Sequence, residues 1–459
     1  MVVVQKTSQV PAYPAPPRRA RRTQHRAKRM TMKRLAGRLN LFQRTMLDWR
    51  DLHPYIAVHA VRVPQPLDRL AVMRAIDETL EHAGLTGLEL DRDRGRYEWH
   101  GGASASKLEV VAAGDAWQSA LARTFERHLN EPFAREGRID PFRFFAIDAG
   151  DAFFLGIAYD HFIAGGDSIV VLLNAIVDRY AGKPTPAPFS RYPRTHRRLF
   201  AQHPLRFVRG LARLPAMASS CRRTIRPRYR AIDDGYNAFT FFTLDEAEYS
   251  GLRRAAKAWS VTLNDALIAL LLLAQDAQSP RDRTKRRHEL AVASIMNLRD
   301  AHGEDSRTTF GQFLSSFRVS HPVAPDTTLA EIARDVNAAT TRVKRERLYL
   351  TTLAAIAVDR VIGRFRTREQ RMGVYAKSYP VGAGVSSLNV NALWRTADGE
   401  GAPTYIRGVP TGPASPIVVA VTTSGGTLCA GITYRTAAAG PDDIGQLQAH
   451  LRSRIQALT

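Results

Sequence analysis

One histidine, His161, stands at the junction between a predicted strand and a predicted helix. Residues 152–159 form a continuous apolar run, which is typical of a strand buried on both faces, and residues 169–180 follow an apolar helix pattern. Ligands of α/β proteins gather at the carboxyl ends of strands. A neutral imidazole there can act as a general base near pH 7, so the pattern indicates proton-transfer chemistry. A histidine picked at random among the 13 in this chain is more often structural.

Two glycines and two polar residues lie between His161 and the helix. Gly165 and Gly166 carry no side chain, so a substrate or a neighbouring backbone can come close. Asp167 and Ser168 follow, and either has the side chain expected of the residue that caps helix 169–180. One short segment therefore combines a general base, a close-approach loop and a helix start.

This segment resembles the His-His-x-x-x-Asp-Gly signature of the chloramphenicol-acetyltransferase-like acyltransferases. That superfamily includes condensation domains of nonribosomal peptide synthetases, polyketide-associated acyltransferases and bacterial wax-ester synthases. Asp160 stands at the first histidine, His161 at the second, catalytic one, and Gly166 at the final glycine. Gly165 stands where the family has an aspartate that pairs with an arginine and holds the loop. Asp167, two residues on, is the candidate to replace that aspartate.

Further segments resemble the family in the same order along the chain, over residues 39–459. They are 41–54, Pro141-Phe142-Arg143, Thr262-Leu263-Asn264-Asp265, Met296-Asn297-Leu298-Arg299, Phe310-Gly311-Gln312-Phe313 and Ser386-Ser387-Leu388-Asn389. The resemblance implies that five of these residues line a substrate tunnel: Asn297, Arg299, Gly311, Ser386 and Asn389. The alternative is that they only close strand ends, bend the chain or satisfy strand hydrogen bonds.

The resemblance also implies a fold and a reaction. Two lobes would form a V-shaped pseudodimer with the active-site tunnel between them. An acyl thioester, on coenzyme A or on the phosphopantetheine arm of an acyl carrier protein, would enter from one side, and a small alcohol or amine from the other. His161 would take the proton of the attacking nucleophile, and proximity would supply much of the acceleration. No permanently bound cofactor and no metal are implied.

The predicted elements favour an α/β (α+β) protein of two mixed lobes, because strand–helix series occur twice. Strands are expected at 54–63, 152–159, 238–243, 289–296, 381–390, 416–423 and 427–434. Helices are expected at 118–130, 169–180, 245–258, 263–276, 328–345, 350–363 and 441–458, and from Asp68 with Leu70, Met73, Ile76 and Leu80 on one face. The predicted parts are a basic disordered tail (1–38), an N-terminal lobe (39–180), an Arg-rich linker (181–232) and a C-terminal lobe (233–459).

Positive charge is concentrated in two short stretches. The formal charge is +23, yet residues 1–47 hold 12 basic side chains and no acid, and residues 179–232 hold 14 and no acid. The remaining 358 residues carry a net charge of −3. This distribution excludes a uniformly basic nucleic-acid coat, and no nucleic-acid-binding motif accompanies it. It indicates a docking surface for an acidic carrier protein, the phosphates of coenzyme A or an anionic membrane.

Within the linker, apolar residues are spaced as one helix face beside a basic flank. They are Phe200, Leu205, Phe207, Val208, Leu211, Leu214 and Met217. The spacing is compatible with a basic amphipathic helix on a membrane, or with a helix that packs on the body and exposes its arginines, which we favour. For the tail, translation from Met30 or Met32 is an alternative start.

The cysteines and the apolar runs bear on location. Cys221 and Cys429 lie far apart and offer neither a disulfide framework nor metal-ligand spacing, which favours a reducing compartment. The longest apolar run, 266–274, is much shorter than the roughly 18 residues of a spanning helix. We therefore expect a cytoplasmic protein, with peripheral membrane contact as a further option.

Two other functions stay open at this level. Because Gly165 replaces the family's aspartate, the protein could keep the tunnel as a non-catalytic condensation-domain-like binding protein. Because of its Arg-rich stretches, it could also be a basic protein that associates with membrane surfaces.

Overall fold

The computed structural model describes residues 35–183, 189, 196–278, 284, 286–303, 305, 308–394 and 403–459. Residues 1–34 of the predicted tail and most of 184–195 in the predicted linker lie outside the described residues. The last four residues of the predicted tail form strand β1 (Leu35–Arg38), which pairs antiparallel with β4 (Arg96–Trp99).

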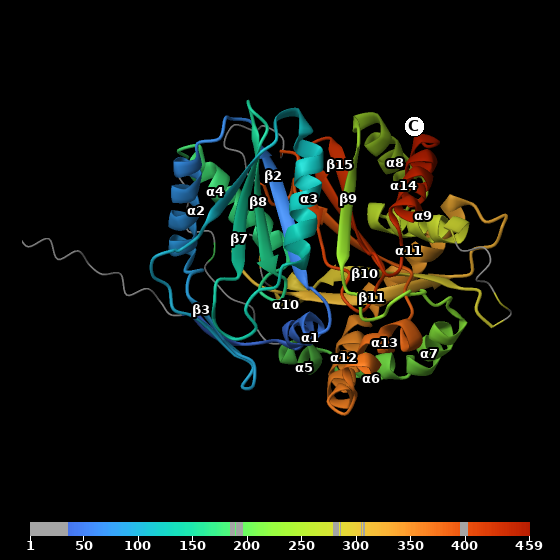
Figure 1. Cartoon of the computed structure of the whole chain (residues 1–459). Helices are drawn as coiled ribbons and strands as arrows, with labels where there is room; N and C mark the ends of the chain where they lie inside the picture. The colour runs from blue at the N-terminus through green and yellow to red at the C-terminus, as the bar shows by residue number, and fades with distance from the viewer. Residues whose placement is uncertain are drawn as a thin grey trace, which may run out of the picture. The chain divides into compact units, whose positions relative to one another are not determined.

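The first half of the chain builds two sheets, with strand orders β13-β2-β8-β7-β5 and β1-β4-β3-β6 (Figure 1). Their other strands are β2 (Ile56–Val63), β3 (Leu88–Asp91), β5 (Leu108–Ala112), β6 (Gly137–Ile139), β7 (Phe142–Asp148), β8 (Phe153–Asp160) and β13 (Tyr405–Gly408). β13 comes from the distant predicted C-terminal lobe and pairs antiparallel with β2, with Arg407 opposite His59. A segment late in the chain therefore completes the first sheet.

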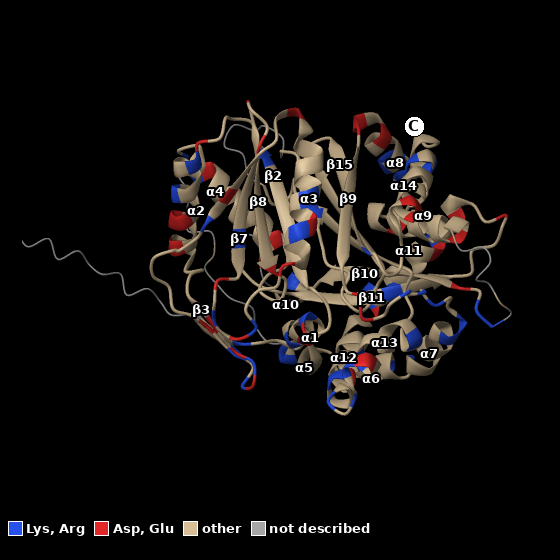
Figure 2. Ribbon diagram, in the orientation of Figure 1, with Lys and Arg blue, Asp and Glu red and all other residues tan. Residues whose placement is uncertain are grey.

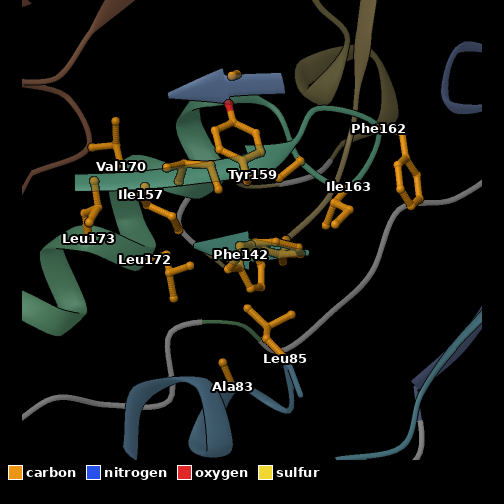
Figure 3. Close-up of a cluster of buried hydrophobic side chains, with 14 of the residues drawn as sticks. Ala83, Leu85, Phe142, Ile157, Tyr159, Phe162, Ile163, Val170, Leu172 and Leu173 are labelled. Carbon is orange, nitrogen blue, oxygen red and sulfur yellow. The ribbon is translucent and has the colours of Figure 1, made fainter. Parts of the chain in front are cut away.

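Helices cover both faces of the five-stranded sheet. α2 and α4 pack on one face and α3 on the other, so all eight residues of β8 are buried, as predicted. Figure 3 shows the first of these layers, where Val170, Leu172 and Leu173 of α4 lie near Ile157 and Tyr159 of β8. The helices of this half are α1 (Leu41–Arg50), α2 (Arg69–Ala83), the short 3₁₀ turn η1 (Gly114–Ala116), α3 (Trp117–Asn130) and α4 (Gly166–Tyr180).

The second half builds a six-stranded sheet with the order β11-β10-β12-β14-β15-β9 (Figure 1). Its strands are β9 (Asn237–Leu244), β10 (Leu290–Asn297), β11 (Leu314–His321), β12 (Ala383–Asn389), β14 (Ile417–Ser424) and β15 (Thr427–Arg435). Its helices are α8 (Glu246–Ala258), α9 (Leu263–Gln278), α10 (Arg299–His302), α11 (Leu329–Arg345), α12 (Tyr349–Gly363), α13 (Arg368–Ser378) and α14 (Pro441–Gln456). A separate apolar core lies between this sheet and helices α8, α9, α11 and α14.

The layers around the five-stranded sheet meet the six-stranded sheet at two places. α3 contacts β9, and β13, the edge strand of the five-stranded sheet, contacts β14 and β15. At the last contact a Cβ on Gly431 would overlap the carbonyl oxygen of Arg407, so a glycine is needed for the strands to approach. The predicted α/β class with two sheet-centred parts is confirmed. Most predicted elements also match within a few residues, and the additional elements include β1, β3 to β6, β13, α1, α10 and α13.

Two local predictions about helices are wrong. Leu70 is 72% exposed, because the buried face of α2 is made by Val72, Ile76 and Leu80 instead. The cap of α4 is Gly165, without a side-chain bond, since the side chains of Asp167 and Ser168 bond elsewhere.

The linker forms three short helices instead of one amphipathic helix: α5 (Arg197–Gln202), α6 (Pro204–Leu211) and α7 (Leu214–Arg223). Prolines in the first turns of α6 and α7 start new helices. α6 packs on α12, and Gly210 allows this because a Cβ there would overlap Thr351 Oγ1. Figure 2 shows Lys and Arg over α5, α7 and the end of α12. The packed alternative describes this segment better.

Among the described residues, no single helix is long and apolar enough to cross a bilayer; α8 and α9 pass that test only as a pair bent by 102°.

Candidate active site

A cavity of about 350 Å³ is lined by residues from both halves of the chain. His161, Gly166 and Asp167 line it from the segment between β8 and α4. Asn297 at the end of β10 and Ser386 in β12 line it from the second sheet. The structure therefore brings together five residues that the sequence analysis placed in a tunnel or its loop.

His161 is held on three sides by backbone and aromatic groups. Its N–H donates to the carbonyl of Tyr55 at 3.3 Å, and its carbonyl accepts from Gln312 Nε2 at 2.9 Å. The imidazole stacks on the Tyr55 ring at 5.7 Å between centroids and meets the Tyr159 ring edge-on at the same distance. These contacts leave the ring little freedom to turn.

Burial sets the protonation state of His161. The side chain is 8% exposed, and desolvation lowers the pKa of His161 from 6.5 to about 4. The nearby carbonyl of Ala164 opposes this shift, and the charge of Arg407 adds to it. Nδ1 is buried and has no well-aligned hydrogen-bond partner among the described residues, which leaves Nε2 as the nitrogen that faces the cavity. The imidazole is therefore neutral near pH 7, the form that accepts a proton.

Asp167 forms a buried ion pair with Arg299. Its Oδ2 accepts from Arg299 Nε at 2.9 Å and from Asn297 Nδ2 at 2.6 Å, and both charged side chains are almost fully buried. This is the role that the family resemblance implies for the aspartate replaced by Gly165. A Cβ on Gly165 would stand 3.2 Å from Asp167 Oδ1, so position 165 lies next to that carboxylate.

Arg299 also donates hydrogen bonds to Ser168 and to the loop that holds Thr309 and Gly311. Its Nη2 donates to Ser168 Oγ at 2.6 Å, and Nη1 donates to the carbonyl of Thr309 at 2.6 Å. The carbonyl of Gly311, which accepts from the Gly165 N–H at 3.0 Å, also accepts from Arg299 Nη2 at 3.3 Å. Gly311 has φ 142°, a value that favours glycine. The start of α4 is thus tied to the second half of the chain.

Several predicted site residues lie away from the cavity. Arg299 and Gly311 act on it only through the loop just described. Asp160 is buried in an ion pair with Arg50, where it anchors α1. Asn389 is exposed at the end of β12 and does not line the cavity.

The sequence analysis missed four polar residues around His161. Tyr55 stacks on it, and His59 Nδ1 lies 2.8 Å from the Tyr405 hydroxyl. Arg407, opposite His59, lines the cavity together with Trp49 of α1. Only the alternation of strand 54–63 pointed to His59, and nothing local marked residues 405–408 as a strand. Within the described part of the chain, no group of three His, Cys, Asp or Glu side chains is arranged to hold a metal ion.

Acid should destabilise the protein through its buried histidines. Burial lowers the pKa of His53 to about 3 and those of His128, His161 and His196 to about 4. Between pH 6.5 and 5 the unfolded chain binds protons that the folded chain does not. As the pH is lowered through this range, the free energy of unfolding should therefore decrease by up to about 1.4 kcal/mol per pH unit for each histidine. Urea unfolding at pH 7, 6 and 5 measures this, and a His128→Gln variant should show a shallower dependence. Equal stability at the three pH values would refute the expectation.

Solved structures share this architecture. The first condensation domain of the calcium-dependent antibiotic synthetase, in complex with a substrate analogue, has a TM-score of 0.68 at 14% identity over 92% of this chain and 97% of that one. A variant of the starter condensation domain of rhizomide synthetase in complex with C8-CoA has a TM-score of 0.64 at 14% identity, over 92% and 94%. The epimerization domain from the third module of tyrocidine synthetase B has 0.60 at 13% identity, over 93% and 97%.

The sequence itself matches no protein-family model and no curated protein. At such low identity the structural likeness establishes the fold, and the reaction has to be argued from the site. The chain has the fold of condensation domains.

Proposed function

We propose that this protein transfers an acyl group from a thioester to an alcohol or an amine, with His161 as the general base. The observation that carries the proposal is a neutral, buried imidazole that faces a cavity lined from both halves of the chain. The condensation-domain fold supports acyl transfer as the type of reaction, although the tyrocidine relative is an epimerization domain.

The proposed reaction needs one base and no acyl-enzyme. Nε2 of His161 accepts the proton of the acceptor O–H or N–H as that atom attacks the thioester carbonyl. The tetrahedral intermediate collapses, the C–S bond breaks, and the imidazolium returns the proton to the leaving thiolate. Stacking on Tyr55 holds the ring, the Gln312 side chain holds the His161 carbonyl, and binding both substrates in one cavity supplies proximity.

The condensation-domain fold supports a proposal for the donor and the acceptor. We propose acyl-coenzyme A or an acyl carrier protein as donor, and a small alcohol or amine as acceptor. A panel of acyl thioesters and acceptors, read by mass spectrometry, tests this. Thioester should be consumed only when an acceptor is present. Binding of thioester with no product from any pair would favour the non-catalytic alternative. Asp167 argues against that alternative, because it supplies the carboxylate that Gly165 lacks.

We also propose that the protein resides in the cytoplasm and touches an anionic membrane through α12. This helix lines the cavity with Thr352, Ala355 and Ile356. Its other face exposes apolar side chains at the spacing of one helical stripe, namely Val358, Val361, Ile362 and, just beyond its end, Phe365. Exposed apolar stripes of this kind mark interaction surfaces.

The charges beside the stripe favour an anionic lipid surface as the partner. Arg360 and Arg366 pair with Asp48 and Asp359, whereas Arg364 is exposed and has no carboxylate partner among the described residues.

Cys221 and Cys429 are both free and buried, which agrees with a reducing compartment.

Sedimentation with vesicles tests the membrane contact. The protein should sediment with phosphatidylserine–phosphatidylcholine vesicles more than with phosphatidylcholine alone, because anionic lipids attract arginines. Phe365→Asp should reduce sedimentation at least about threefold, since it replaces the most exposed side chain of this stripe, at 86%, with a charge repelled by the lipid. Val110→Asp, at an exposed valine in β5, is the matched control. Equal sedimentation of both variants would contradict the proposed surface.

A further inference from the structure

Arg407 is a buried arginine in the wall of the cavity. It is 2% exposed, and three of its N–H groups are used by the second sheet. Nε donates to Thr422 Oγ1 at 2.8 Å, and Nη2 donates to two carbonyl oxygens at 2.7 Å, those of Ser386 and Val421. These bonds hold the guanidinium in one orientation.

The remaining nitrogen, Nη1, makes no hydrogen bond to any described residue. A Cβ on Gly166 would stand 3.5 Å from it, and both Gly166 and Arg407 line the cavity. A guanidinium has five N–H donors, so two of them remain for a molecule in the cavity. Gly166 keeps the approach to Nη1 open, because any side chain there would fill the space in front of it.

The charge of Arg407 is not compensated by a neighbouring carboxylate. No ion pair among the described residues includes it, and Asp167, whose charge acts on it, is already bound by Arg299 and Asn297. The other titratable groups that act on it include Tyr159, Tyr405 and Cys429, which are neutral near pH 7 because burial raises their pKa values.

The protonation states of His59 and of Arg407 itself also set the charge at this wall of the cavity. His59, across the strand pair from Arg407, is neutral because burial lowers its pKa well below 6.5. Burial lowers the pKa of Arg407 itself to about 10, so it stays charged at neutral pH. An isolated buried cation is costly, and one that faces a cavity is positioned to receive an anion.

We propose that Nη1 of Arg407 binds a carboxylate carried by one of the substrates. This rests on the proposed use of the cavity for acyl transfer and narrows the substrate class to molecules with an apolar body and a carboxylate. A single negative charge matches the single uncompensated positive charge. A phosphate dianion would bring excess charge into a cavity with mainly apolar walls.

Arg407 also holds β13 against β12 and β14, so a merely structural role has to be distinguished by experiment. The probes are octanoate and octanamide, which differ only in the charged group, and calorimetry measures their binding without any turnover. Wild-type protein should bind octanoate at least about tenfold tighter than octanamide, as charge-assisted hydrogen bonds require. Equal affinities in wild type would overturn the proposal without using any variant.

Variants locate the preference at Arg407. Arg407→Met should abolish the preference for octanoate while leaving octanamide affinity within about twofold, because the methionine fills the same apolar volume. Arg435→Met, at another buried arginine that does not line the cavity, is the matched control and should keep the preference. Retention of the full preference by Arg407→Met would also overturn the proposal. Since binding is measured apart from turnover, failure of carboxylate recognition and failure of acyl transfer are separate results.

Discussion

The His161→Ala variant should lose about 100-fold to 10,000-fold of the acyl-transfer rate, the range that general acid–base catalysis contributes. The reason is local. Nε2 is the cavity-facing nitrogen of a neutral imidazole. Among the described residues, His59 is the other histidine that lines the cavity, but it is fully buried, and its ring nitrogens lie 2.8 Å from the Tyr405 hydroxyl and 3.3 Å from the Tyr159 hydroxyl. The measurement is product formation by mass spectrometry with the donor–acceptor pair that wild type turns over.

A matched control separates the loss of a base from the loss of a buried side chain. His128 is also buried, with its pKa lowered to about 4, but it lies outside the cavity against Phe145. His128→Ala should therefore keep nearly full activity. If His161→Ala does so as well, the assignment of the base is wrong.

The pH profile of the wild type gives an independent check on the same residue. The base form of His161 is the neutral one, and its pKa is lowered to about 4. Over the pH range in which urea unfolding shows the protein to be folded, the rate should not change from pH 8 downward and should decline only as the pH approaches 4. An inflection near pH 6.5 would indicate a solvent-exposed imidazole instead.

The second large effect is expected at Asp167. Asp167→Ala leaves the guanidinium of Arg299 buried without its carboxylate, and breaking a buried pair in this way costs about 3–5 kcal/mol. Urea unfolding should show that loss. Acyl transfer should also fall, because the start of α4 and the loop that carries His161 are tied together through this pair.

A compensating variant tests whether the carboxylate alone matters. A Cβ on Gly165 would lie beside Asp167 Oδ1, and Gly165 has φ −80°, which any residue adopts. Gly165→Asp combined with Asp167→Ala should therefore place a carboxylate near Arg299 again and recover a large part of the stability. Asn297→Ala, which removes only a neutral donor, should cost about 1 kcal/mol. A loss below 1 kcal/mol for Asp167→Ala alone would show that the pair does not hold the loop.

The buried parts of this fold could be predicted because their signals are local. The run 152–159 predicted a strand buried on both faces, and β8 has no exposed residue. Short strands such as β3 and β4, of four residues each, carry no comparable pattern and were missed. The helix face with Leu70 was wrong because periodicity alone does not say which of two neighbouring apolar positions meets α4.

The site divides in the same way. The sequence by itself proposed His161 as the base, because residues 160–166 resemble the family signature, and the structure places that histidine on the cavity. It also named Asp167 as the substitute for the missing aspartate, but only packing over 132 residues of chain brings that carboxylate to Arg299. No pattern in the sequence marked Arg407 as a site residue, because it reaches the cavity through the pairing of β13 with β2, some 340 residues earlier in the chain. Secondary-structure propensity and hydrophobic periodicity depend on residues that are neighbours in the sequence. Burial, desolvation and the choice of charge partner depend on segments that meet only in the folded chain.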